Sequence, residues 1–228
     1  MHFNMRMSRL GRILILITGC ALFNLSFRQL PDDSDIKQLW RDCKIEGSVS
    51  FNVFYCAIKG YRHIDQIKKK SIISIIDFSK PSTDERFVVI DLVNKKVLYK
   101  CLCAHGRNSG DNIATTFSNK AESLMSSPGF FLTGETYSGK HGYSLRLDGL
   151  EKGINDNARS REIVIHGADY VSSNFIKKYG RIGRSWGCPA LPLEFSKEII
   201  DIISGGTCLF IYCDDTDYKS ASQLLKGE

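Results

Sequence analysis

The chain has 228 residues, of which 43% are hydrophobic, 11% aromatic and 25% charged, and this composition is too apolar for a disordered chain. Its 19 glycines and 5 prolines exclude a collagen-like or linker-like protein, and the length allows one sizeable hydrophobic core. The formal net charge is +6, but three arginines lie in the first dozen residues. Without them, 28 basic residues stand against 25 acidic ones, which gives little support to nucleic-acid binding.

Residues 1–30 have the pattern of an export leader. An arginine-rich start precedes a continuous apolar stretch at 13–23, which is shorter than the roughly 20 residues that span a membrane. Segment 17–20 resembles a bacterial lipoprotein box, in which Cys20 becomes the lipidated N-terminus; plain cleavage and an uncleaved anchor are the alternatives. Each alternative predicts a domain that works outside the cytoplasm.

Residues 31–70 are expected to form a helical section. Apolar residues recur at intervals of three and four over 35–43 and 49–60, which predicts two helices. Ser48 or Ser50 could cap the start of the second helix, and Gly60 is expected to end it.

From residue 71 to residue 228 the pattern changes to strands, which are expected at 72–78, 87–92, 97–102, 129–137, 143–147, 162–166 and 207–212. Two late helices are expected near 170–179 and 194–203, the second of which ends at Gly205-Gly206. Many short strands with few helices predict a β-rich α+β fold with a sandwich or barrel core.

The eight cysteines do not form the dense pattern of a disulfide scaffold, and no C-x-x-C is present. Apart from Cys20 and one reactive thiol, six remain, some of which an oxidising compartment could pair. Alternatively, most of them are small buried hydrophobic residues.

Cys188 lies between Gly187 and Pro189, in a loop setting where a thiol can be exposed and activated. A cysteine nucleophile needs a base, and His166, at the end of an apolar strand, is the best candidate. A neighbouring imidazolium would lower the pKa of Cys188. Pro189 has no N–H, so an oxyanion hole would use the amides of Cys188, Gly187 and Trp186, within a turn that begins at Ser185.

Other polar residues nearby admit two interpretations each. Arg184 could bind a substrate carboxylate or form a surface ion pair. His105 and His141 are structural or substrate-lining groups rather than bases. Three histidines and a cysteine could also make a tetrahedral zinc site, but no two have close metal-ligand spacing, so no metal or other cofactor is expected. Cys188 itself could be structural or paired.

The sequence resembles the L,D-transpeptidase catalytic (YkuD-like) superfamily, whose signature is His-Gly, a spacer and then Ser/Thr-x-Gly-Cys. His166-Gly167 and Ser185-Trp186-Gly187-Cys188 carry this signature. The stretches 76–81, 104–110, 141–147, 166–170 and 183–190 also have counterparts in the branch of murein L,D-transpeptidase catalytic domain proteins.

The resemblance implies an exported enzyme of the bacterial cell envelope or periplasm that acts on peptidoglycan stem peptides as donor and acceptor and forms 3-3 crosslinks. Cys188 would be the nucleophile and His166 the general base. Further substrate-binding candidates in the matching stretches are Gly167, Tyr143, Asn108, Ser109, His105, His141 and Arg184. We expect a monomer, with a lipid anchor as one option.

Two departures from the better-known branch affect this expectation. That branch has a second histidine where this chain has Trp186, and an arginine where this chain has Ala190. The nucleophile is unaffected, but the acceptor and the reaction outcome stay open. A peptidoglycan carboxypeptidase or endopeptidase that uses the same cysteine, and a non-catalytic wall-binding lipoprotein, are the alternatives.

Overall fold

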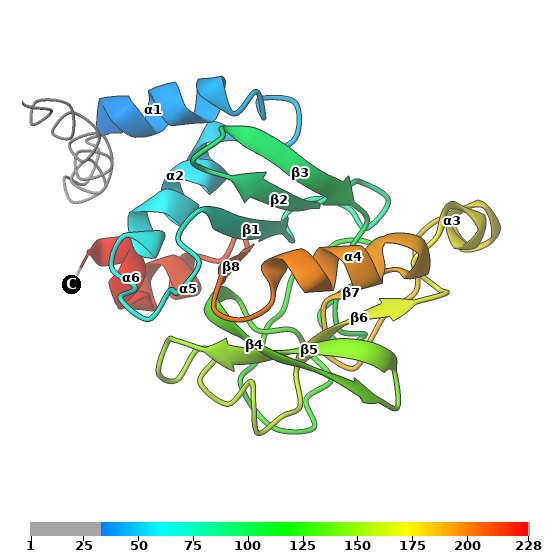
Figure 1. The fold of residues 1–228 in the computed structure, drawn as a ribbon. Coiled ribbons are helices and arrows are strands. Elements are labelled where there is room, and N and C mark those ends of the chain that lie inside the picture. The colour runs from blue at the N-terminus through cyan, green and yellow to red at the C-terminus, as the bar shows by residue number, and fades with distance from the viewer. Residues whose placement is uncertain (1–32, 228) are drawn as a thin grey trace, which may run out of the picture. The chain divides into compact units, whose positions relative to one another are not determined.

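Eight strands form one sheet in the computed structural model, which describes residues 33–227 (Figure 1). The predicted leader, with Cys20, lies outside the described residues. Within residues 33–227, no helix has both the length and the apolar character needed to cross a membrane.

The strands follow the order β3-β2-β1-β8-β4-β5-β6-β7 across the sheet. Their bounds are β1 Ile72–Asp77, β2 Phe87–Asp91, β3 Lys96–Cys101, β4 Gly129–Gly139, β5 Gly142–Gly149, β6 Val164–Ala168, β7 Ala190–Pro192 and β8 Cys208–Tyr212. Most neighbours pair antiparallel, and β1–β8 and β6–β7 are parallel.

The two outer strands of the sheet are joined just beyond the end of β3. Ala104 forms an antiparallel bridge with Ala190 of β7, through a hydrogen bond of 2.8 Å from the Ala104 amide to the Ala190 carbonyl. The sheet is therefore nearly closed and barrel-like, which confirms the predicted β-rich fold class.

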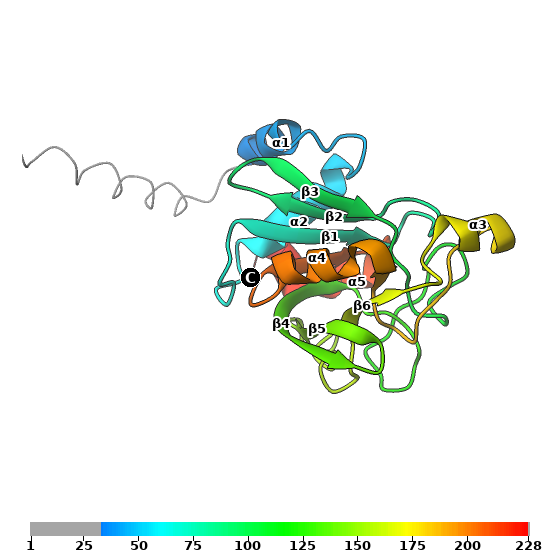
Figure 2. The same cartoon turned by 45° about the vertical axis from the view of Figure 1, so that its right-hand side comes forward.

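Helices cover two sides of the sheet. α1 (Asp33–Asp42), α2 (Phe51–Tyr61), α5 (Thr216–Ala221) and α6 (Gln223–Lys226) share one apolar core with β1, β2 and β8. α4 (Leu193–Ile203) buries Ile199, Ile200 and Ile203 in a second core, and lies between β1 and the β4–β5 hairpin in both views (Figures 1 and 2). Because β1 and β8 contact both cores, both strands are buried along nearly their whole length, and Ser74 and Asp77 are the polar residues of β1.

The second predicted helix differs in detail from the expectation. Ser50 caps α2, with its hydroxyl oxygen accepting from the Val53 amide at 3.3 Å. Gly60 does not end the helix, which continues to Tyr61. A Cβ at position 60 would overlap the ring of Phe130, so this glycine serves the packing of α2 on the sheet.

The remaining expected elements are present with small shifts at their ends, including α3 (Ser173–Tyr179). The short β7, α5 and α6 were not predicted. The cysteines of the described residues, seven in number, are all free thiols, so the structure agrees with small buried hydrophobic residues rather than with disulfides.

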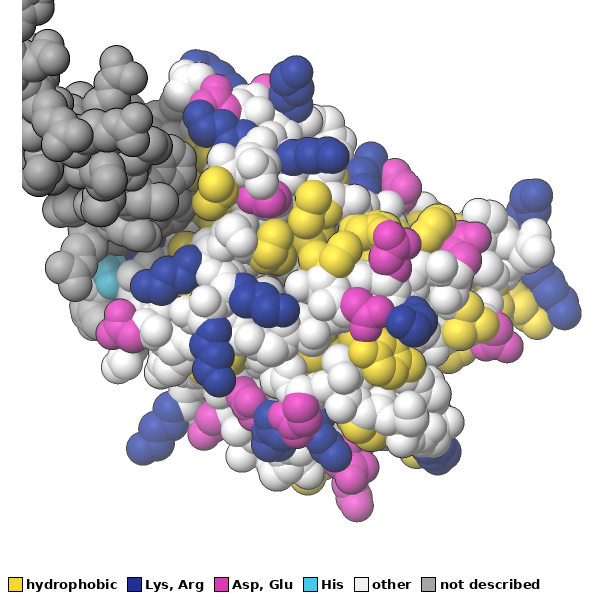
Figure 3. All heavy atoms as spheres, viewed as in Figure 1, with side chains coloured by type: hydrophobic (Ala, Val, Ile, Leu, Met, Phe, Trp, Pro, Cys, Tyr) yellow, Lys and Arg dark blue, Asp and Glu magenta, His cyan; other side chains and the backbone are white. Residues whose placement is uncertain are grey.

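The face seen in Figure 3 carries charged side chains of both signs, with apolar side chains gathered between β3 and α4. This mixture agrees with the small charge excess of the sequence and shows no broad basic surface on that face.

Candidate functional site

Residues 185–188 form a tight turn that presents the thiol of Cys188. The Ser185 hydroxyl donates to the Cys188 carbonyl oxygen at 2.6 Å and accepts from the Gly187 amide at 3.1 Å. The Gly187 carbonyl oxygen accepts from the Ser126 hydroxyl at 3.0 Å. The turn is thus fixed by side-chain hydrogen bonds from within and from a segment far away in the sequence.

Gly187 is required by this geometry. Its φ is +128°, a conformation that side-chain-bearing residues rarely adopt. A Cβ at this position would lie 2.8 Å from the Met125 carbonyl oxygen and 3.0 Å from Ile163 Cδ1. Because its amide already donates to Ser185, only the amides of Trp186 and Cys188 remain from the predicted oxyanion set.

His166 lies on β6 and is 3% exposed. Its Nδ1 is 3.0 Å from the Gly167 carbonyl oxygen, and because a carbonyl only accepts, Nδ1 carries the proton. Nε2 then holds the lone pair that a general base needs. Burial lowers the pKa of His166, and the neighbouring His141 lowers it further, so the neutral form is favoured.

The pairing of β6 with β7 brings the Cys188 turn to the His166 strand. His166 pairs with Ala190, two residues after the cysteine. The sulfur of Cys188 lies 3.7 Å from the Glu162 carbonyl oxygen, just before β6 begins. The two residues named by the sequence signature therefore lie on adjacent segments.

The expected lowering of the Cys188 pKa is not what the structure shows. Burial raises the pKa of the thiol, because the thiolate loses its hydration. A hydrogen bond from the Val164 amide and the positive charge of Arg161 act in the opposite direction. The thiol and the imidazole are thus both held in their neutral forms.

Arg161 is a residue of this site that the sequence did not indicate. Its guanidinium donates to Met125 O and Ser118 O, each at 2.7 Å, and to the hydroxyls of Ser127 and Ser123 at 2.7 and 3.1 Å. It ties the 118–127 segment to the residues just before β6 and supplies positive charge near the sulfur of Cys188. No residue spacing distinguishes it from an ordinary surface arginine.

Several predicted substrate-binding residues have internal partners instead. His105 is fully buried, with its Nδ1 2.7 Å from Nη2 of the buried Arg86, and burial together with Arg86 lowers its pKa to about 4. Ser109 is also fully buried, and its hydroxyl oxygen accepts from the Ser126 amide at 2.9 Å. Asn108 is exposed, but its amide group donates to Ser123 O at 2.9 Å. These residues brace the loops behind the Cys188 turn.

Arg184 and Tyr143 hold neighbouring elements in place. The Arg184 guanidinium donates to Gly110 O at 2.9 Å and pairs with Asp111 at 3.2 Å, which matches the ion-pair interpretation. The Tyr143 hydroxyl donates to Asp201 of α4 at 2.6 Å. Gly167 has no room for a side chain, because a Cβ there would overlap the hydroxyl of Ser196 on α4.

His141 and Trp186 are the exposed aromatic groups of the site. The His141 ring stacks on that of His166, with centroids 4.5 Å apart and an interplanar angle of 22°. Trp186 is 65% exposed, and the ammonium of Lys140 lies 5.3 Å from its ring centroid.

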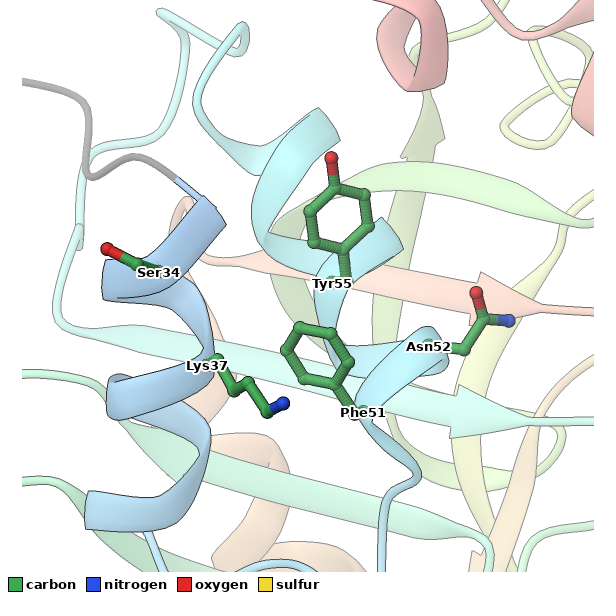
Figure 4. A pocket seen from close by; sticks show the side chains of 5 residues that line it. All are labelled: Ser34, Lys37, Phe51, Asn52 and Tyr55. Carbon is green, nitrogen blue, oxygen red and sulfur yellow. The ribbon is translucent and has the colours of Figure 1, made fainter.

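A separate hollow of about 470 Å³ lies between α1 and α2, and Figure 4 shows Lys37 and Phe51 on its two sides. Its lining carries neither a thiol nor a histidine, so it offers no chemistry comparable to the Cys188 turn. Among residues 33–227, no group of three or more His, Cys, Asp or Glu is arranged to hold a metal ion.

Comparison with protein families matches the chain to the L,D-transpeptidase catalytic domain over residues 45–212. This range contains β1–β8, the Cys188 turn and His166. No curated protein matches.

Solved structures that resemble the chain are distant from it in sequence. An L,D-transpeptidase from Mycobacterium smegmatis has 14% identity and a TM-score of 0.39, with 63% of this chain and 59% of that chain covered. L,D-transpeptidase 3 from Mycobacterium tuberculosis has 10% identity and a TM-score of 0.40, with coverages of 63% and 61%. An L,D-transpeptidase from Stackebrandtia nassauensis has 14% identity and a TM-score of 0.38, with coverages of 79% and 77%. The chain thus spans less than two thirds of the length of the first two.

Proposed function

Because the chain belongs to the L,D-transpeptidase catalytic domain family, we propose that it is a cysteine-dependent enzyme that joins peptidoglycan stem peptides by 3-3 crosslinks. It acts at the bacterial cell envelope after export, as a monomer, with lipidation of Cys20 as one means of attachment.

In the proposed cycle, Nε2 of His166 takes the proton of the Cys188 thiol as the sulfur attacks the carbonyl carbon of the L-centre of the third stem residue. The C–N bond to the terminal D-amino acid breaks, and that amine leaves with the proton from His166. An amine of a second stem then attacks the thioacyl carbon, its proton passes through His166 to the sulfur, and the crosslinked peptide is released.

One observation carries this proposal: the pairing of β6 with β7 puts the thiol-bearing turn against the strand of a histidine whose tautomer is fixed by the Gly167 carbonyl. The tautomer matters because only an unprotonated Nε2 can accept the thiol proton. The Trp186 and Cys188 amides are proposed as the donors for the oxyanion, since the Gly187 amide is engaged with Ser185.

The test is incubation of the full chain with purified disaccharide-tetrapeptide, followed by mass spectrometry of the products. Crosslinked dimers with release of the terminal D-amino acid support the proposal, and Cys188→Ala should lower their formation by about 10⁴-fold or more. Cys56→Ala, which changes a half-buried thiol on α2, should retain activity.

Trimmed monomers without dimers would replace the transpeptidase assignment by a carboxypeptidase that uses the same cysteine. Identical product profiles for the unchanged protein and Cys188→Ala would overturn catalysis by this thiol and favour a wall-binding protein.

A further inference from the structure

The turn at the tip of the β4–β5 hairpin lies over both segments of the candidate site. Gly139 pairs with Gly142, so the turn consists of Lys140 and His141. His141 stacks on His166. Lys140 reaches over Trp186, two residues before Cys188. A peptide that enters the site therefore passes beside this tip.

Lys140 is an unpaired cation at this position. Its ammonium forms no ion pair with any carboxylate of residues 33–227, and it lies over the Trp186 ring, 5.3 Å from the centroid. The other cations around the Cys188 turn are engaged. Arg184 pairs with Asp111, and Arg161 donates to oxygens of the 118–127 segment.

Trp186 gives the same position a large apolar surface. At 65% exposure it is the most exposed of the large hydrophobic side chains in the described chain, although a ring of this size is normally kept from water. An ammonium over an indole face and an open ring plane together suit a ligand that combines an aliphatic chain with an anionic end.

We propose that Lys140 and Trp186 form a subsite for a free carboxylate of the stem peptide, with the ammonium pairing with the carboxylate and the indole covering the adjacent aliphatic chain. The hairpin tip would thus bind the substrate carboxylate for which the sequence suggested Arg184. The inference rests on the proposed function, because it takes the stem peptide as the ligand. Two carboxylates could be bound, the one on the side chain of the third, diamino-acid residue and the one at the peptide C-terminus.

The experiment measures binding to the full chain carrying Cys188→Ala by isothermal titration calorimetry. Three tetrapeptides are compared: one with both carboxylates free, one amidated on the third side chain and one amidated at the C-terminus. Amidation of the bound carboxylate should weaken binding about threefold to fivefold, as expected for an exposed ion pair. The peptide that loses affinity identifies which carboxylate is bound.

Lys140→Met should abolish this amidation effect, and Lys140→Arg should preserve it. Lys152→Met is the matched control, since it removes an exposed lysine outside the hairpin tip and should leave the effect unchanged. Added salt should reduce the effect in the protein with Lys140.

Two failures are distinguishable. If all three peptides bind but amidation changes their affinity equally with and without Lys140, the proposed subsite is wrong and the proposed function stands. If none of the peptides binds to the protein that retains Lys140, the proposed function itself is overturned, and the subsite with it.

Discussion

At the scale of single residues, the Cys188 thiol and the His166 imidazole are both held in their neutral forms. Burial raises the pKa of the Cys188 thiol and lowers the pKa of the His166 imidazole. A resting thiolate–imidazolium pair would need a lowered pKa for the thiol and a raised pKa for the imidazole. The proposed cycle therefore begins from a protonated thiol and a neutral imidazole, and the proton transfer accompanies the attack of the sulfur.

The first prediction concerns the alkylation of Cys188 by iodoacetamide, followed by mass spectrometry of its peptide so that other thiols do not interfere. The pH midpoint of the alkylation rate should lie above that of free cysteine, because burial opposes the thiolate. Arg161→Met should move the midpoint higher still, and Arg161→Lys should stay near the unchanged protein, because the positive charge is retained. A midpoint below that of free cysteine, or one that Arg161→Met leaves in place, would contradict this account.

The second prediction concerns His141, whose charge lowers the pKa of His166. His141→Phe keeps a ring stacked on His166 but removes the charge, so the His166 pKa should rise. Since the proposed base is the neutral form of His166, the acidic limb of kcat/KM against pH should move to higher pH. NMR titration of His166 provides a readout that does not depend on turnover. His63→Phe, at an exposed histidine away from the site, should move neither curve.

At the scale of elements, the strands that carry the site follow from their sequences, but their pairing does not. β6 could be predicted because the residues that lead into His166, Val164 and Ile165, are β-branched and apolar, although the strand runs on to Ala168. β7 could not, because three residues that end in a proline have no strand signature, yet the pairing of β7 with β6 sets the Cys188 turn beside the strand of His166.

The residues that support the Cys188 turn could not be predicted for a related reason. Ser126 donates a hydrogen bond to Gly187, which lies 61 positions further along the sequence, and nothing in either residue type predicts such a contact. Ser109 belongs to the same network and was predicted as a substrate contact, because a family pattern marks which stretches match but not which side chains point inward. The signature residues of the site could therefore be predicted from the sequence, whereas the buried residues that hold them in place could not.

The third prediction separates the two constraints on Gly187. Gly187→Ala imposes both a positive φ and an overlap with the Met125 carbonyl, and should destabilise the fold by about 3 kcal/mol. Gly153→Ala has a φ of +80° with no atom within 4 Å, so it should cost only about 1 kcal/mol. Gly47→Ala, with neither constraint, should be nearly neutral. Urea denaturation of the three variants tests this order, and equal losses at positions 187 and 153 would refute a role for the Met125 contact.

At the scale of the whole molecule, a buried carboxylate connects the sheet to the C-terminal helices. Glu151 follows β5 and is 6% exposed. One of its oxygens accepts from the Phe130 amide at 2.7 Å and the Tyr218 hydroxyl at 3.4 Å, and the other from the Ser222 hydroxyl. It thereby joins β4 to α5 and to the start of α6, on the side of the sheet away from α4.

The fourth prediction follows from the protonation of Glu151. Burial raises the pKa of its carboxyl in the folded chain, despite the hydrogen bonds that act in the opposite direction. The stability that this group contributes is therefore fully present below its unfolded pKa and is lost as the pH rises through its folded pKa. The side chain in Glu151→Gln carries no charge at any pH, so the variant does not lose this stability as the pH rises. The difference between its free energy of unfolding and that of the unchanged protein should therefore increase by on the order of 1 kcal/mol from about pH 4 to pH 7.5. Urea denaturation at the two pH values measures this change, with Glu122→Gln as the control for loss of an exposed carboxylate. A difference that stays constant or decreases would show that Glu151 is ionised in the fold without penalty.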